Sequence, residues 1–225
     1  MDPSARATAL LGHARQAAGC ERCGLAAKRT QVVYGAGNPD ARLMLVGEAP
    51  GFAEDRNGVP FAGHAGDLLE RLLADVGLDR DDVYSTSVLK CRPPRNRDPR
   101  DDEIAACEPL LFRQLELVRP RVVATLGNFA TRLLSGRPHG ITSIHGQELQ
   151  LTVGDVECVL YPLFHPAAAL YTPSMLRTLE TDFARIPALL AEPGLDRPVE
   201  ASPRDAVEDG MRTTEQRETV QLGLF

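Results

Sequence analysis

Apolar residues along the chain fall into two kinds of pattern. Residues 42–46, 83–89 and 121–126 form short apolar runs, which are typical of buried strands. Residues 66–77 and 98–115 instead carry apolar side chains three and four positions apart, which predicts helices with one buried face. Strand, loop and helix therefore repeat along the chain.

The remaining pattern adds three helices and a hairpin. Residues 5–18, 127–134 and 173–191 have a helical period, and residues 148–153 and 157–161 flank a Gly-Asp turn. Strands that alternate with helices favour a parallel sheet covered on both faces. We therefore expect an α/β fold, a three-layer sandwich with a central, mainly parallel, four-stranded sheet flanked by helices.

The composition changes after residue 192. Residues 193–220 are rich in Pro, Asp, Glu, Arg, Ser and Thr and poor in apolar residues, which predicts a disordered linker. The last residues, 221–225, are mostly apolar again. We expect one folded domain over residues 1–192, followed by the linker and a short C-terminal peptide.

Length and composition are those of an ordinary globular protein. The chain has 225 residues, of which 43% are hydrophobic and 25% charged. It contains no apolar run near the roughly 18 residues that a transmembrane helix needs, and residues 1–15 lack the layout of a signal peptide. We expect a cytoplasmic protein.

The net charge of −6 is unevenly distributed. Residues 189–225 hold eight acidic and four basic side chains, so most of the excess lies near or beyond the end of the predicted domain. A basic stretch within the domain is suited to contact phosphates. Its members are Lys90, Arg92, Arg95, Arg97 and Arg100. The alternative is a solvated loop whose charge is balanced by the neighbouring Asp98, Asp101 and Asp102.

Four cysteines are spaced like the ligands of a metal site. They form the pairs Cys20-x2-Cys23 and Cys91-x15-Cys107. In a reducing compartment, paired cysteines are more often metal ligands or redox groups than disulfides. Their thiolates suit a structural zinc or an iron–sulfur cluster. A fifth cysteine, Cys158, lies in a predicted strand and is expected to be a core residue.

Three loops follow the ends of predicted strands. They are Gly47–Gly51, Ser87–Cys91 and His165–Ala168. In open α/β sheets, ligands bind beyond the carboxyl ends of the strands, so we expect the three loops to meet at one site. Each motif alone also suits an ordinary turn or a packed residue. Their common placement is the argument for a site.

These loops, together with Glu54–Gly66 and Lys90–Pro94, resemble the family 4 uracil-DNA glycosylases. The resemblance extends from Cys20 to Leu190. It implies that the chain cleaves uracil from DNA and leaves an abasic site in base excision repair, as a monofunctional hydrolase. It also implies that a 4Fe-4S cluster is bound by Cys20, Cys23, Cys91 and Cys107.

The resemblance assigns roles at the base pocket. A base stacked in a duplex must be flipped out before it can react. Phe61 would stack on the flipped uracil, in a pocket that also includes Gly47, Ala49 and Ser87. His165 would donate a hydrogen bond to uracil O2 as negative charge develops on the departing base.

The attacking water needs a carboxylate that orients it and offsets the positive charge on the sugar. Glu48 is the first candidate and Glu54 the second, with Asn96 as a helper matched to the family motif. Better-known uracil glycosylases carry an aspartate at the position of Ala49, so another carboxylate must serve here.

One position departs from the family pattern. Family members generally carry an asparagine four residues before the third cysteine, where its amide reads the edge of uracil, and this chain has Ser87. A hydroxyl lacks the fixed donor and acceptor pair of an amide. We expect slower excision or a broader base preference than in the family.

Further residues are expected to contact DNA or a partner. Lys90, Arg92 and Arg95 would bind phosphates, and their contribution would fall with salt. Leu170 would fill the gap left by the flipped nucleotide, or else pack within a helix.

The C-terminal peptide resembles the motif by which bacterial repair proteins bind the replication sliding clamp. Its contacts would be Gln221, Leu222, Leu224 and Phe225. Tethering would hold a monomeric enzyme near the nucleoid. The alternative is an apolar segment that folds back onto its own domain.

Two other functions fit part of the sequence. A relative of these glycosylases that binds uracil-containing DNA, or becomes covalently trapped on it, would turn over little. A zinc-bound DNA-binding module would use the cysteines without catalysis. Product formation distinguishes the first from a glycosylase, and a brown colour distinguishes an iron–sulfur cluster from zinc.

Overall fold

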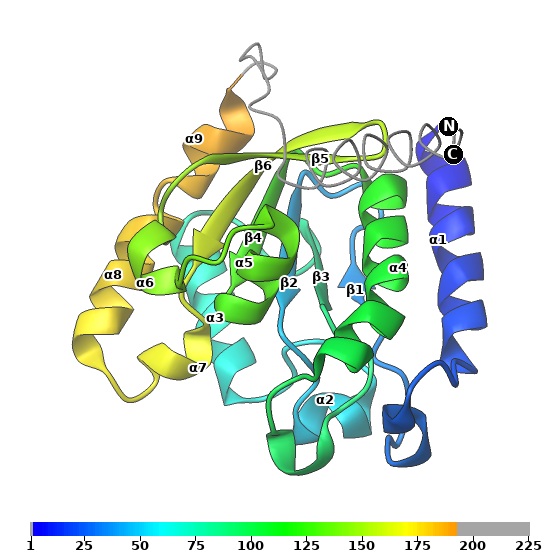
Figure 1. Cartoon of the computed structure of the whole chain (residues 1–225). Coiled ribbons are helices and arrows are strands. Elements are labelled where there is room, and N and C mark those ends of the chain that lie inside the picture. Colours follow the sequence, from blue (N-terminus) through cyan, green and yellow to red (C-terminus); the bar gives the residue numbers. More distant parts are fainter. Residues whose placement is uncertain (1, 193–225) are drawn as a thin grey trace, which may run out of the picture.

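A six-stranded mixed sheet forms the centre of residues 2–192, which are the residues described by the computed structural model (Figure 1). The predicted linker and C-terminal peptide lie outside them. The strand order is β1-β3-β2-β4-β6-β5. The strands are β1 Ala36–Gly37, β2 Leu43–Gly47, β3 Val83–Ser87, β4 Val122–Leu126, β5 Leu149–Val153 and β6 Val156–Leu163.

Helices cover both faces of this sheet (Figure 1). The longer helices are α1 Pro3–Ala18, α3 His64–Asp75, α4 Asp101–Val118, α5 Asn128–Ser135 and α8 Pro173–Phe183. The short ones are α2 Phe52–Asn57, α6 Ile141–Ile144, α7 Pro166–Ala169 and α9 Ile186–Ala191, with 3-10 turns η1 Gly24–Ala27 and η2 Pro94–Asn96. No helix within residues 2–192 has the length and apolar character needed to cross a bilayer.

The sheet separates two apolar cores. Met44 and Val46 of β2 pack with residues of α1, α4 and α5, whereas Leu43 and Leu45 pack with residues of α3, α8 and α9. Because successive side chains of a strand point to opposite faces, one continuous apolar run supplies both cores. The predicted α/β arrangement of three layers is confirmed.

The prediction of four strands was wrong. The pairs β2–β3, β2–β4 and β4–β6 are parallel, and an antiparallel strand is added at each edge, β1 beside β3 and β5 beside β6. The sequence does not reveal β1, since it consists of only Ala36 and Gly37 and has no apolar alternation. The hairpin strand β5 joins the same sheet through its partner β6.

Two predicted helices differ most from their expected bounds. The helix expected from residue 98 begins at Asp101, because the Glu103 carboxylate accepts the Arg100 N–H at 3.0 Å and so caps that turn. The helix expected over 173–191 is divided into α8 and α9. Pro187 lies in the first turn of α9, where it has no N–H to donate to a preceding helical turn.

The parallel strands all end at one edge of the sheet, the lower edge in Figure 1. Gly47 of β2 is opposite Ser87 of β3, and Leu126 of β4 is opposite Leu163 of β6. The loops that follow these four strands therefore emerge side by side, as expected for a ligand site in an open α/β sheet.

Candidate active site

The loops at this edge enclose a cavity of about 440 Å³. All the residues predicted to bind or act on the base line it, namely Gly47, Glu48, Ala49, Glu54, Phe61, Ser87, Asn96 and His165. Pro93 and Arg97 also line it, although neither was predicted to contact the base. Asn96, which lies near both in sequence, was the one residue of this segment predicted to act at the site. Four separated segments thus meet at one cavity.

The ring of Phe61 is packed tightly against the end of β2. A Cβ atom on Gly47 would lie 2.9 Å from Phe61 Cζ and 3.3 Å from Ser87 Oγ. Gly47 therefore leaves the space in which these two side chains face the cavity. Phe61 itself has a φ of 54°, which is the left-handed region that L side chains seldom adopt.

His165 is held neutral with one defined tautomer. Its Nδ1 accepts the backbone N–H of Ala167 at 3.1 Å, so the ring proton of the neutral form is on Nε2. Burial lowers the pKa of His165 to about 4, with a smaller opposing effect from Glu54. Its ring lies 6.3 Å from that of Phe61, centre to centre. Nε2 is therefore a hydrogen-bond donor beside the aromatic wall.

The two candidate carboxylates have different surroundings. Glu54 accepts three backbone N–H groups, from Gly51 at 3.0 Å, Ala62 at 3.0 Å and Gly63 at 3.2 Å. Glu48 is half-buried, and burial, with a contribution from Asp98, raises its pKa. Among residues 2–192 no hydrogen bond to its carboxylate is found. Glu54 is thus occupied in organising its loop, whereas Glu48 is available to a water.

The four predicted ligand cysteines line a second, smaller cavity, with Arg29 and Lys90. All are free thiols. Two already accept N–H donors, Cys107 Sγ from the Lys90 backbone at 3.2 Å and Cys91 Sγ from Arg29 Nη1 at 3.6 Å. Within residues 2–192 no three His, Cys, Asp or Glu side chains are grouped so that they could hold a single metal ion.

Comparison with known proteins identifies the family. Residues 34–187 match the model of the Uracil DNA glycosylase superfamily. The chain is 43% identical over 179 residues to the Type-4 uracil-DNA glycosylase of Sulfurisphaera tokodaii. The aligned residues cover 77% of this chain and 81% of that protein. The chain belongs to the type-4 uracil-DNA glycosylase family. The corresponding protein of Thermotoga maritima is 43% identical over 149 residues, or 66% of this chain and 76% of its own.

Likeness to a neighbouring group is more limited. The Type-5 uracil-DNA glycosylase of Pyrobaculum aerophilum is 40% identical over 111 residues, which is 43% of this chain and 49% of that protein. The type-4 relatives thus account for much more of the present chain.

The structure contradicts one predicted DNA contact of this family member. Lys90 is 1% exposed, so it cannot reach a phosphate. Its Nζ donates to Thr86 Oγ1, to the Ser87 carbonyl and to Gln114 Oε1, each at 2.6 Å. The prediction was wrong because the helix α4, which supplies Gln114, covers the end of β3. Burial lowers the pKa of Lys90 to about 7, and Cys107 opposes this shift.

The other basic residues of the loop do lie at the surface. Arg92 donates through Nε to Asn96 Oδ1 at 2.7 Å, and its guanidinium lies 5.1 Å from the ring centre of Phe52. Arg95 is exposed and has a φ of 57°. Arg97 is instead paired with Glu103, at 2.5 and 2.8 Å.

Leu170 is exposed at the C-terminal end of α7, the short helix that follows His165. It is 39% exposed, and the adjacent Tyr171 is 88% exposed. Both residues line a surface groove of about 450 Å³, whose opposite wall includes His64 and Arg71 of α3. Leu170 is therefore not a core residue of a helix, which was the alternative to a DNA contact.

Proposed function

We propose that this chain hydrolyses the bond between uracil and deoxyribose in DNA at the cavity beyond β2, β3 and β6. The reaction is that of the family to which it belongs. The observation that carries the site is the convergence of Phe61, His165 and Glu48 on one cavity of a size suited to a small ligand. Only a base extruded from the duplex can enter it.

The base is held between an aromatic wall and a polar floor. Phe61 stacks on the flipped uracil, and Gly47 leaves room for the ring. Ser87, which is 6% exposed, presents its hydroxyl on the same side as the missing Gly47 side chain. A single hydroxyl can donate or accept, so it accommodates more than one pattern of base edge.

His165 stabilises the leaving group. Bond cleavage places negative charge on uracil, and the Nε2–H of the neutral imidazole donates to uracil O2 as that charge grows. Because the bond from Ala167 holds Nδ1, the ring need not change its tautomer during the reaction. The contact is stronger in the transition state than in the ground state, and it therefore raises the rate.

Glu48 orients the attacking water and offsets the positive charge of the sugar. Its carboxylate lines the cavity and is not engaged by backbone donors, unlike that of Glu54. Glu54 supports the reaction by shaping the loop, and Asn96, held by Arg92, borders the same space. Water addition at the sugar completes the hydrolysis and leaves an abasic site.

The four cysteines hold a 4Fe-4S cluster. Their set of soft thiolates, their common cavity and the N–H donors on Cys91 and Cys107 fit this group. The buried ammonium of Lys90 fits it as well, since its three hydrogen-bond acceptors are neutral and the negative thiolates would offset its charge. When bound, the cluster supplies a covalent cross-link between the N-terminal segment and the sheet.

DNA lies across the mouth of this cavity. Arg92 and Arg95 contact phosphates, and Leu170 enters the gap left by the flipped nucleotide. The exposure of Leu170, two residues after Ala168 of the cavity lining, supports this role. The C-terminal peptide, with Leu224 and Phe225, binds the sliding clamp. Its deletion should abolish clamp binding in a pull-down assay and leave excision intact.

The test is product formation from DNA that contains one uracil. Purified chain is incubated with a labelled oligonucleotide, and abasic sites are cleaved with alkali. We expect a shortened product from the uracil strand and none from a matched thymine strand. A chain that shifts uracil DNA in a gel but yields no product would be a binding protein, and the proposal would fail.

A further inference from the structure

The backbone at Phe61 is held in an unfavourable conformation. Its φ of 54° is costly for a residue with a Cβ atom, and such a conformation persists only where surrounding contacts fix it. The ring of the same residue is the wall of the base cavity. Whatever fixes this backbone therefore also sets the plane on which a base would stack.

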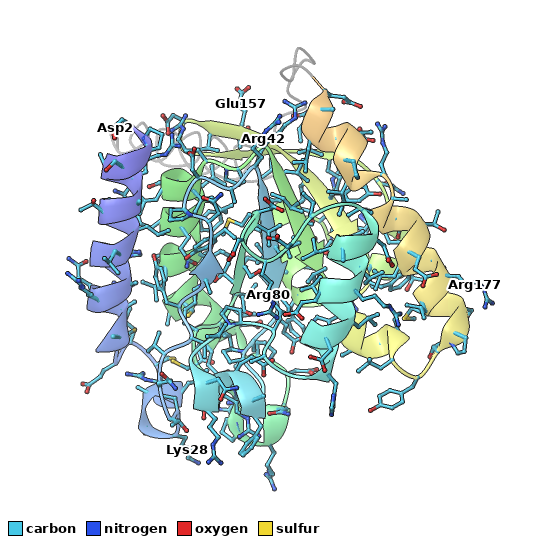
Figure 2. All side chains as sticks on the ribbon, turned by 180° about the vertical axis from the view of Figure 1, so that it is seen from behind. Asp2, Lys28, Arg42, Arg80, Glu157 and Arg177 are labelled. Atoms are coloured by element: carbon cyan, nitrogen blue, oxygen red, sulfur yellow. The ribbon has the colours of Figure 1, made fainter. Side chains whose placement is uncertain are left out.

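Arg80 provides the fixing contacts. Its guanidinium donates through Nη2 to the carbonyl of Phe61 and through Nη1 to that of Pro60, at 3.5 Å for the latter. Its Nε lies 2.5 Å from Glu70 Oε1 of α3, which orients the planar group. Figure 2 shows Arg80 beside α3, on the loop that leads from this helix to β3.

Gly66 makes this arrangement possible. A Cβ atom at position 66 would lie 1.8 Å from the Phe61 carbonyl oxygen and 3.1 Å from Arg80 Nη2. The carbonyl and the guanidinium therefore meet only because α3 presents no side chain there. On the other side of the residue, the ring abuts the space left by Gly47. Arg80 thus holds the carbonyl of Phe61, and the ring of Phe61 lies against Gly47.

We propose that Arg80 is a positioning residue that sets the stacking plane of Phe61 without touching the substrate. Arg80 does not line the cavity, so it acts through Phe61 alone. The inference rests on the proposed stacking role of Phe61. Misplacement of a positioning group by about 1 Å can cost as much as 100-fold in rate.

The test is a double-mutant cycle between the two residues. Arg80→Met keeps the length of the side chain and removes its donors, and it should lower kcat/KM on uracil DNA by roughly 10- to 100-fold. Phe61→Ala should lower it by a similar factor. In the Phe61→Ala background, Arg80→Met should cost little more, since the ring that Arg80 positions is already gone.

Three controls make the cycle decisive. Arg80→Lys keeps one donor and should recover part of the rate, and Glu70→Gln should retain most of it. Arg177→Met removes an exposed arginine of α8 and should change nothing. Melting temperatures identify any variant that fails to fold, in which case the Arg80→Lys cycle is used.

The outcomes separate the two assignments. If Phe61→Ala is slow but the two losses multiply in the double variant, Arg80 does not act through Phe61 and the inference is overturned. If Phe61→Ala has the full rate, the stacking role itself fails. A slow Arg80→Met variant, together with a double variant equal to Phe61→Ala alone, supports both. An Arg80→Met variant with the full rate overturns the inference.

Discussion

At His165, burial and one backbone hydrogen bond determine the state of a side chain that ordinarily titrates near neutral pH. The Ala167 N–H occupies Nδ1, and the low-dielectric surroundings disfavour the charged imidazolium. The result is a neutral donor at the position where a leaving base would gain charge. The same burial has a consequence for stability, which can be measured without substrate.

We expect stability to decrease as the pH falls through the range set by His165. The pKa of His165 is about 4 in the folded chain, below the ordinary 6.5. As the pH falls, the unfolded chain therefore takes up a proton at His165 at a higher pH than the folded chain does. The contribution of the neutral His165 to the free energy of unfolding is complete above pH 6.5 and is lost as the pH falls toward 4. The melting temperature of the wild type should therefore fall more steeply over this range than that of His165→Gln.

The exposed His139 provides the control for this measurement. His139→Gln should keep the steep pH dependence of the wild type. Identical slopes for the wild type and His165→Gln would show that burial of His165 does not penalise its protonation.

Ser87 should determine which bases are excised. It stands where the family generally carries an asparagine, and its hydroxyl cannot present a fixed donor and acceptor to a base edge. We expect Ser87→Asn to raise the rate on uracil and to lower the relative rates on hypoxanthine and xanthine. The measurement is single-turnover excision from matched oligonucleotides. Ser85→Asn, in the same strand but outside the cavity, is the control, and unchanged profiles in Ser87→Asn would contradict the prediction.

At the scale of elements, the Glu54 carboxylate links the two ends of the loop around α2, in addition to the contacts that Arg80 makes with Pro60 and Phe61. Glu54 accepts N–H groups both from the start of α2 and from the loop after it, at Ala62 and Gly63. These bonds close the segment that carries Phe61 against the segment that carries Glu48. The two glutamates are therefore predicted to have different roles. Glu54 maintains the structure of the loop, and Glu48 orients the attacking water.

Glutamine substitutions separate these roles. Glu54→Gln replaces one acceptor oxygen by an amide group facing backbone donors, and it should lower the free energy of unfolding by about 1–3 kcal/mol. Glu48→Gln should leave the unfolding curve unchanged and lower kcat by about 10²- to 10⁴-fold. Urea denaturation and single-turnover rates of both variants provide the measurement. Full activity of Glu48→Gln would remove it from the water-orienting role.

At the scale of the whole molecule, the four predicted ligand cysteines come from separate parts of the chain and line one cavity. Cys20 and Cys23 follow α1, Cys91 follows β3, and Cys107 lies within α4. A cluster bound to all four contributes its binding free energy to folding. The cavity proposed to hold the base includes Ser87, a few residues from Cys91, so loss of the cluster should also affect activity.

Cys107→Ser should yield protein with little bound iron and sulfide and without the brown colour. Its melting temperature should fall by about 5–10 °C, given the roughly 2–4 °C per kcal/mol expected for a domain of this size. Cys158→Ala is the matched control, since Cys158 is a buried core cysteine outside the predicted ligand set, and its thiol donates a hydrogen bond to the Leu151 carbonyl at 3.7 Å. It should retain its iron. A colourless but equally stable Cys107→Ser protein would show that the cysteines do not brace the fold.

The sequence determined the kinds of element, their order and the chemistry of the loops. Short apolar runs and helical periods are local properties, so the strands β2, β3, β4 and β6 and the helices α3, α4 and α5 were predictable within a few residues. The short helices α2 and α6 were not predicted. The motifs that contain Glu48, Phe61 and His165 were equally visible, because each is a contiguous run of residues. Their meeting place followed from the rule for parallel strands.

Only the tertiary structure decided what depends on contacts distant in sequence. Lys90 belongs to a basic stretch, yet its ammonium is buried because Gln114 of α4 packs over the end of β3. Glu48 and Glu54 are the same residue type and lie close together in the sequence. Their predicted roles differ because the backbone N–H groups of Ala62 and Gly63 donate to Glu54 and not to Glu48. Burial and hydrogen bonding arise when separate elements pack together, so no local pattern of residues can specify them.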